Sequence, residues 1–399
     1  MLKIQKEAKI LITFSLFCSF GVSVVFPYIP IFGKEIGMPV ILIGNLVVLY
    51  YLLQALTRIP LGKLSDLIGH DRPIFIGALI YFSSGVSFLL STIFWPMLFI
   101  GEMLLGVANS VTWVTVPSYI TEAKNALPTF TFTVALGWMI GSPVGGYIKD
   151  KSGMNMVFLT LFFVSLVLIY LSWLFYSESN TQAKRNTVRD FIRMANISPS
   201  SLPIYPSFRS YVDAWKLFRT NKHILFASLF SFVVFMTFGL GASIVPLYFS
   251  EVGISSFFIG ILVSIRLTTS TFIKLSCNFF TKRFGNYKVL IASTVIAGMF
   301  VAFVALSESF LLIAIFSALW GFGSGLYLPI VFKIIGDHST KEERGVAMGI
   351  RGTLGTFGAA FGTWTFSAIA ASLSLSSSLL IAGFFAIICS LVLGLLFKS

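Results

Sequence analysis

Three ionisable side chains interrupt the apolar runs of this sequence, and their types indicate the chemistry that they could perform. Glu102, Arg266 and Arg351 each lie about seven to ten residues, or roughly 10–15 Å of helix, inside such a run. A carboxyl group in that position can take up and release a proton, and a guanidinium group can bind a carboxylate or a phosphate. Charges inside a membrane are costly and usually functional, although an ion pair that only holds helices together would also explain them.

The residue types that bind metals or form disulfides are too scattered to build such sites. Cys18, Cys277 and Cys389 lie far apart inside apolar runs, without the paired spacing of a zinc site or a disulfide framework. The three histidines fall in connections between apolar runs, and no nucleophile–base pair or phosphate-binding loop is present. We therefore expect no metal, no cofactor and no enzymatic activity.

The elements that position these charges are long apolar segments. The chain has 399 residues, of which 56% are hydrophobic and 11% charged, with a mean hydropathy of +0.92. Soluble domains carry about 25% charged residues, so the lipid bilayer must be the solvent for much of this chain. Runs long enough to cross a bilayer as helices occupy residues 9–32, 40–62, 73–92, 95–119, 128–149, 154–176, 223–250, 256–280, 288–306, 309–335, 343–371 and 377–397.

These runs predict an all-α membrane protein with twelve transmembrane helices in two groups of six. The groups are separated by residues 177–221, which carry seven basic residues and three prolines. We expect an N-terminal six-helix bundle over 1–176, a cytoplasmic linker over 177–221, and a C-terminal six-helix bundle over 222–399. The linker is too short to hold a second soluble domain.

The distribution of basic residues predicts the orientation in the membrane. With both termini inside, the cytoplasmic segments and helix ends hold 23 of the 28 basic residues, and the external loops hold three. Basic residues favour the cytoplasmic side, so we expect a multi-pass protein of the plasma membrane with both termini in the cytoplasm. The net charge of +13 is spread over short loops, which argues against a nucleic-acid partner.

The two halves match each other at a constant offset of 216 residues, which indicates an internal duplication. The matched pairs are Pro30 and Pro246, Glu35 and Glu251, Gly37 and Gly253, Gly44 and Gly260, Gly69 and Gly285, and Arg72 and Lys288. Arg58 falls opposite Lys274, and both lie near predicted cytoplasmic helix ends where they could snorkel or pair. Duplicated halves are typical of transporters whose substrate site lies between the repeats.

The loop after the second run carries a motif with a family resemblance. Gly62, Leu64, Asp66 and Gly69 match the pattern G-x-L-x-D-x-x-G-R-[RK], with a basic residue slightly later at Arg72. This pattern resembles the cytoplasmic signature of the major facilitator superfamily. A degenerate copy surrounds the repeat mate of Gly69 in the second half. The resemblance implies a gating role for the motif, in which Asp66 makes charge-assisted contacts in one access state.

The fifth run carries a second pattern, of small residues around a proline. Its members are Gly137, Gly141, Pro143, Gly145 and Gly146. It resembles the antiporter signature G-x3-G-P-x2-G-G of the drug and metabolite efflux branch, with the proline shifted by one residue. Small residues let membrane helices approach closely, so we expect these positions to pack against a neighbouring helix.

The resemblance implies that helices 1, 4, 7 and 10 line a central cavity, flanked by helices 2, 5, 8 and 11. It would direct Glu102, Arg266 and Arg351 toward that cavity as candidates for binding substrate or protons. Tyr50, the repeat mate of Arg266, would offer a hydroxyl from the second helix. Efflux members carry an arginine four residues before the glycine matched by Gly106, whereas this sequence has Glu102 there, so an acid could carry the proton instead. Further aromatic candidates for the cavity wall are Trp113, Trp138, Trp320 and Tyr327.

The residues and the resemblance together favour a secondary active transporter that exports a small molecule, drug-like or a metabolite, in exchange for protons. We expect it to work by alternating access as a monomer. The alternative is a uniporter or symporter that imports a sugar or an organic anion, because two cavity arginines suit a carboxylate or phosphate. A membrane sensor or scaffold without transport activity is a third hypothesis.

Overall fold

The computed structural model describes residues 6–122, 127–183 and 216–397, and the regular elements in these ranges are helices. For some helical positions only the backbone is described, namely 59, 62, 63, 66, 67, 121, 122, 127, 180–183, 341, 342 and 345. The expected linker therefore lies largely outside the described residues.

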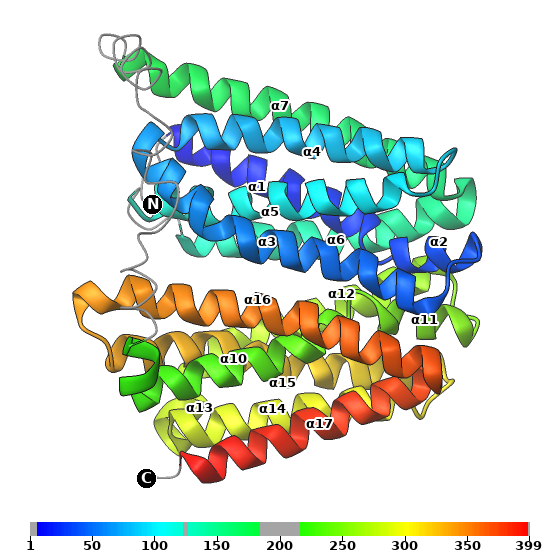
Figure 1. Ribbon diagram of the computed structural model, residues 1–399, viewed down its shortest axis with the longest axis vertical. Coiled ribbons are helices and arrows are strands. Elements are labelled where there is room, and N and C mark those ends of the chain that lie inside the picture. Colours follow the sequence, from blue (N-terminus) through cyan, green and yellow to red (C-terminus); the bar gives the residue numbers. More distant parts are fainter. Residues whose placement is uncertain (1–5, 123–126, 184–215, 398–399) are drawn as a thin grey trace.

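The helices fall into two groups along the chain (Figure 1). The first half contains α1 (Lys6–Val25), α2 (Ile29–Glu35), α3 (Val40–Ile68), α4 (Asp71–Ser91), α5 (Met97–Glu122), α6 (Leu127–Ser152) and α7 (Met154–Ala183). The second half contains α10 (Lys222–Leu240), α11 (Ile244–Glu251), α12 (Ser256–Ile273), the 3-10 turn η2 (Lys274–Ser276), α13 (Cys277–Phe284), α14 (Asn286–Val304), α15 (Phe310–Asp337), α16 (Lys341–Ser372) and α17 (Leu375–Leu396).

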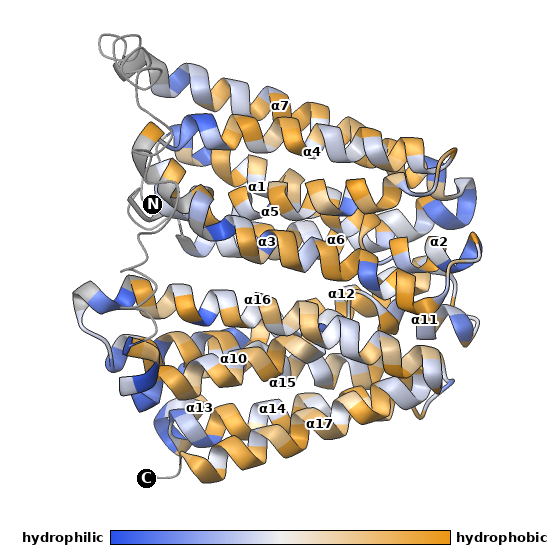
Figure 2. Ribbon diagram, viewed as in Figure 1, coloured by the Kyte–Doolittle hydropathy of each residue, from blue (hydrophilic) through white to orange (hydrophobic). Residues whose placement is uncertain are grey.

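Within the described ranges these helices make twelve membrane crossings. The helix pairs α1–α2 and α10–α11 and the series α12–η2–α13 each form a single crossing. Ten crossings are long and apolar enough to be identified by length and composition, whereas α6 and α16 are diluted by glycine, serine and threonine. Hydrophobic residues dominate the middle of the helices, and hydrophilic residues gather at their two ends (Figure 2). The predicted all-α membrane fold with twelve transmembrane helices is confirmed.

Two ends of the molecule can be distinguished along the helix axes (Figure 1). We call the end at which α1 begins and α17 ends the terminal end, and the end at which α2 and α11 finish the opposite end. The six crossings of each half pack mainly on one another. Contact between the halves runs along two antiparallel pairs of helices, α3 with α16 and α6 with α12.

Three of the predicted spans, 9–32, 223–250 and 256–280, are interrupted rather than continuous. In the first, Pro27 lies between α1 and α2 and has no backbone N–H to donate. In the seventh, α10 and α11 are separated by a turn at residues 241–243, where the Ser243 hydroxyl donates a hydrogen bond of 3.0 Å to the Gly239 carbonyl. The residues at these first two breaks are buried, whereas the third break, at η2, is exposed.

Other helices run past their predicted ends. Helix α3 continues to Ile68 instead of stopping at 62, and α7 continues to Ala183 instead of 176. The added turns are polar. Hydropathy shows where a helix leaves the hydrocarbon region but not where the helix itself ends, so the predicted ends were too early.

The internal repeat is visible in the backbone. Two of the predicted glycine pairs adopt the same left-handed conformation: φ is 80° at Gly37 and 83° at Gly253, and it is 87° at Gly69 and 83° at Gly285. Only glycine adopts this region without strain. These turns therefore explain why glycine occurs at corresponding positions of both halves.

The repeat also fixes how the second and fourth crossings of each half pack. A Cβ added to Gly106 of α5 would lie 2.4 Å from the Tyr50 carbonyl oxygen of α3. A Cβ added to Gly321 of α15 would likewise lie 2.2 Å from the Arg266 carbonyl oxygen of α12. Tyr50 and Arg266 are repeat mates, so both helix pairs use a glycine to approach the same backbone position.

Candidate functional site

Arg266 lies in the interior, stacked on aromatic rings of its own half. Its guanidinium carbon is 4.4 Å from the ring centre of Trp320 and 5.6 Å from that of Phe238, and only 8% of the residue is exposed. A Cβ added to Gly241 would lie 3.0 Å from a guanidinium nitrogen, so the break between α10 and α11 makes room for the charge. Aromatic faces stabilise a cation without neutralising it.

Aromatic side chains of the first half gather at the other broken crossing. The ring of Phe26, just after α1, is centred 4.6 Å from that of Tyr50, 6.3 Å from that of Tyr51 and 6.2 Å from that of Trp138. The Asn109 amide donates a hydrogen bond to the Tyr50 hydroxyl. Tyr51 lies within electrostatic range of Arg266. This aromatic cluster and the Arg266 cluster therefore lie near each other between the halves.

Glu102 is completely buried on α5. Neither carboxyl oxygen has a hydrogen-bond partner among the described residues. Tyr50 and Tyr51 both lie within electrostatic range of its carboxyl group, and Tyr51 also lies within range of Arg266. The described residues show no ion pair between Glu102 and Arg266. These two side chains therefore do not form an interhelical salt bridge in this conformation.

Arg351 lies at a different level from Arg266. Arg351 donates a hydrogen bond of 3.2 Å to the Tyr327 hydroxyl, and its guanidinium is 5.1 Å from the ring centre of Phe332. Tyr327 and Trp320, the aromatic partners of the two arginines, are seven residues apart on α15 (327 − 320), which is roughly 10 Å along the helix. Arg58 of α3 lies close enough to Arg351 for the two positive charges to repel each other.

The halves are bonded together at the opposite end. Asp150 at the end of α6 accepts hydrogen bonds from the backbone N–H groups of Ser256 and Phe257, at 3.0 and 2.8 Å, and so caps α12 of the other half. Partial burial raises the pKa of Asp150, but hydrogen bonds from Phe257, Ser256 and Ser255 outweigh it and leave the pKa below its usual range. Lys34 and Glu251 form an ion pair of 3.0 Å between the halves.

Tyr28 strengthens the same closure from inside. It is fully buried, and its hydroxyl donates to the Ser142 carbonyl and lies 3.3 Å from the Ser256 carbonyl of the second half. Nearer the middle, the Ser264 hydroxyl donates a 2.6 Å bond to the Met139 carbonyl, again across the two halves. These contacts close the passage between α6 and α12 from the centre of the protein to the opposite end.

The predicted gating motif is only partly described. Only the backbone of Gly62 and Asp66 is described, and it belongs to α3. Gly69 ends α3 with a φ of 87°, and Arg72 is the second residue of α4. The motif thus surrounds the turn between α3 and α4 at the terminal end. Asp66 follows Arg58 by eight residues, which is roughly 12 Å along α3.

The predicted packing motif lies along α1. A Cβ added to Gly137, Gly141 or Gly145 would come within 2.7, 2.6 or 2.1 Å of the carbonyl oxygens of Leu16, Phe20 and Val24. A Cβ on Gly146 would come within 2.1 Å of the Ser256 carbonyl across the halves. Pro143 lies inside α6 between these glycines.

The second half repeats this packing. Gly358 and Gly362 of α16 approach the carbonyls of Phe232 and Met236 of α10. Phe232 and Met236 are the repeat mates of Leu16 and Phe20 (232 − 16 = 216; 236 − 20 = 216), whereas the glycines are offset by 221 (358 − 137; 362 − 141). Five additional residues between the crossings of the second half account for the change of offset.

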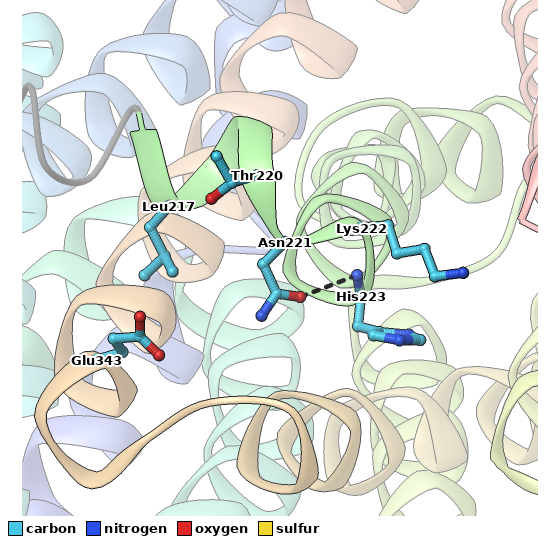
Figure 3. A pocket seen from close by; sticks show the side chains of 6 residues that line it. All are labelled: Leu217, Thr220, Asn221, Lys222, His223 and Glu343. Atoms are coloured by element: carbon cyan, nitrogen blue, oxygen red, sulfur yellow. Dashed lines mark hydrogen bonds between the residues drawn. The ribbon is translucent and has the colours of Figure 1, made fainter.

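A depression of about 460 Å³ lies at the terminal end, away from these clusters (Figure 3). Its lining is Leu217, Thr220, Asn221, Lys222, His223 and Glu343. The Asn221 side chain points into it and caps the start of α10 by accepting from the His223 backbone N–H at 3.1 Å. Its polar groups thus serve the local helix start.

Sequence reasoning missed several residues of the central region. Tyr51 and Phe26 resembled ordinary apolar packing, and Asp150 resembled a solvated loop residue. Arg58 was noticed, but as a charge at a helix end. The antiparallel crossing of α3 and α16 would have identified Arg58. In an antiparallel helix pair, contacting residues have nearly the same sum of residue numbers, as do Gly44 with Ser367 and Arg58 with Gly352.

Comparison with known proteins assigns the fold to a family. The family model of the Major Facilitator Superfamily matches residues 11–251 and 227–399. Crystal structures of the nucleoside transporter NupG share the fold, with TM-scores of 0.75 and 0.73 at 16% and 14% identity, and the better match covers 98% of this chain and 99% of that one.

Relatives by sequence are distant. Multidrug resistance protein 2 of Bacillus subtilis is 23% identical over 60% of this chain, which spans only 56% of that protein's length. An MFS-type transporter of Methanocaldococcus jannaschii is 20% identical over 98% of both chains. The chromaffin granule amine transporter of Rattus norvegicus is 30% identical over 31% of this chain and 25% of its own length. The chain therefore belongs to the Major Facilitator Superfamily and is a multi-pass membrane transporter.

Proposed function

We propose that the protein exports a small molecule in exchange for protons by alternating access, with Glu102 as the group that carries the proton. The burial of Glu102 supports this most directly, because its carboxyl oxygens have no hydrogen-bond donor among the described residues. A charge at such a depth costs about 2.5–3.5 kcal/mol on insertion scales. Protonation removes that cost in this conformation, and access to water in the other would favour release of the proton.

The substrate would bind between the two aromatic clusters. Arg266 offers a cation held by ring faces, and Tyr50 and Tyr51 face it from the first half. The names of the multidrug resistance relative and the amine transporter relative support a small organic molecule as the substrate. Sealing at the opposite end by Asp150 and Tyr28 suits a state that receives its substrate from the terminal end.

The direction of export depends on the orientation, and we assign the terminal end to the cytoplasm of the plasma membrane. The 23-to-3 distribution of basic residues supports this. Single cysteines at Lys34 and at Asn186, the latter outside the described residues, test it with a membrane-impermeant reagent. Labelling of position 186 from outside intact cells would reverse the assignment and turn export into import.

Import of an organic anion is the second candidate function. It is favoured by the three interior arginines, Arg58, Arg266 and Arg351, which have no carboxylate partner among the described residues. Transport in proteoliposomes under an imposed pH gradient separates the two candidates, because export by exchange requires protons to move against the substrate. Uptake that is independent of the gradient would favour a uniporter.

The decisive variant for the proposed function is Glu102→Gln. We expect it to abolish gradient-driven transport across a panel of drug-like compounds and metabolites while leaving substrate exchange at equilibrium intact. Glu308→Gln, an exposed acid in the α14–α15 connection, is the matched control and should transport normally. Gradient-driven transport by Glu102→Gln at the wild-type rate would refute the proton-carrying role.

A further inference from the structure

Arg58 and Arg351 bring two positive charges together from opposite halves of the protein. Arg58 lies on α3 and Arg351 on α16, and the charge of Arg351 disfavours the charge of Arg58. The antiparallel crossing of these helices holds the pair in place, because a Cβ added to Gly352, the neighbour of Arg351, would lie 3.9 Å from Nη1 of Arg58. Like charges placed together inside a membrane protein are costly unless something of opposite charge joins them.

The protein leaves donors of both guanidinium groups unused. The Nε atoms of Arg58 and of Arg351 are buried and have no hydrogen-bond partner in the described part of the chain. Arg351 is only 8% exposed, so water satisfies little of it. No carboxylate described in the structure lies within ion-pair distance of either side chain.

The surroundings of Arg351 position the charge without neutralising it. Its guanidinium lies 5.6 Å from the ring centre of Phe235 and 5.1 Å from that of Phe332. The Tyr327 hydroxyl accepts its Nη2–H bond at 3.2 Å and can still donate its own proton to an anion. Arg351 is thus fixed in orientation, with N–H groups remaining for a ligand.

The position of a side chain at Gly352, beside the pair, is open. Among the described residues, and apart from the backbone of its own helix, the one atom within 4 Å of the Gly352 Cβ position is Nη1 of Arg58, at 3.9 Å. The packing glycines Gly137, Gly141 and Gly145 of α6 meet backbone carbonyls at 2.1–2.7 Å instead. Absence of a side chain at 352 therefore leaves an opening next to Arg58 rather than a tight helix contact.

We propose that Arg58 and Arg351 form a binding site for an oxyanion, the carboxylate or phosphate group of the transported molecule. An anion between the two guanidinium groups would accept charge-assisted hydrogen bonds from both halves. It would also remove their repulsion and draw α3 toward α16. This site rests on the proposed function for its place on the transport route, and it narrows the substrate class to small organic anions.

The repeat supplies a matched control for this site. Lys274 is the repeat mate of Arg58 (274 − 58 = 216) and is also a cation, but it is exposed on the turn η2 of the α12 crossing, and among the described residues no arginine is recorded beside it. A general effect of removing positive charge would appear in Lys274→Gln as well as in Arg58→Gln.

The test measures anion binding by the purified full-length protein, without transport. Inorganic phosphate and a short dicarboxylate are titrated at constant ionic strength against chloride, and the thermal unfolding midpoint is followed. We expect saturable stabilisation of the wild type and of Lys274→Gln. Arg58→Gln and Arg351→Gln should raise the apparent Kd at least tenfold, and Gly352→Val should do the same by filling the opening without changing the charge.

Arg58→Lys keeps the charge and provides a variant that folds if glutamine does not, and it should retain part of the affinity. The site is overturned if phosphate and dicarboxylate do not raise the unfolding midpoint of the wild type. It is also overturned if they raise the midpoints of Arg58→Gln and Gly352→Val as much as that of the wild type. Saturation by a dispersed short-chain phosphatidylglycerol, without a response to the soluble anions, would assign the pair to a lipid headgroup and also overturn it. Anion binding that persists in a protein unable to transport would count against the proposed function and not against this site.

Discussion

The carboxylate of Asp150 accepts a 2.8 Å hydrogen bond from the backbone N–H of Phe257, so the end of α6 in one half caps the start of α12 in the other. A helix start carries unpaired N–H groups and the positive end of the helix dipole. Ser255, the residue in the N-cap position of α12, makes no side-chain cap of its own. The cap is therefore supplied across the interface between the halves and exists only while they are closed at this end.

Removal of this cap should release the opposite end. Asp150→Ala removes both hydrogen bonds, and loss of an N-cap costs about 0.5–2 kcal/mol. We expect faster labelling of a cysteine at Ser256 by a bulky impermeant thiol reagent. Asp150→Asn keeps an acceptor and loses the charge, so its effect should be intermediate, and the exposed neighbour substitution Lys151→Gln should have none. Equal labelling in Asp150→Ala and the parent would show that the cap does not hold the closure.

Acidification should act on the same contact. The pKa of Asp150 is lowered in this conformation by the hydrogen bonds from Phe257, Ser256 and Ser255. A group with a lowered pKa stabilises the conformation above its ordinary pKa, and this contribution is lost as the pH falls through the lowered value. Labelling at the opposite end should thus increase on strong acidification in the parent but not in Asp150→Asn. A pH response that survives in Asp150→Asn would assign it to another group.

The glycines of α6 should be sensitive to the smallest enlargement. A methyl group on Gly145 would lie 2.1 Å from the Val24 carbonyl oxygen, and overpacking typically costs about 1–3 kcal/mol. Gly145→Ala should lower the thermal unfolding midpoint of the detergent-solubilised protein. Gly349→Ala is the control, because no atom of the described residues beyond its own helix backbone lies within 4 Å of its Cβ position and alanine favours a helix by up to about 1 kcal/mol. Similar midpoints for the two variants would contradict the packing argument.

The contact between Arg266 and Trp320 should contribute to substrate binding. Trp320→Leu removes a cation–π interaction worth about 0.5–2 kcal/mol, or roughly 2–30-fold in affinity. We expect the apparent KM of transport to rise within that range. Trp364→Leu, at a residue that is 50% exposed, serves as the matched control. An unchanged KM in Trp320→Leu would exclude the ring from the substrate site.

The sequence by itself determined the class of protein and most of its helices. Apolar runs reveal helices in lipid because each must satisfy its own backbone and face hydrocarbon, and both requirements are local. The glycine pairs Gly37–Gly253 and Gly69–Gly285 were readable for the same reason, since a left-handed turn is decided within a few residues. The buried charges Glu102, Arg266 and Arg351 could also be identified, as rare interruptions of apolar runs.

Only the tertiary structure decided which of these charges meet. Arg351 and Arg266 looked like one anion site, but the crossing of α3 and α16 sets Arg351 beside Arg58, while Arg266 stacks on Trp320 roughly two helix turns away. The cap that Asp150 provides for α12 was equally invisible. Such partners depend on the rotation, tilt and offset of helices from different halves, and hydropathy records only how deep a residue lies, not which neighbour it faces.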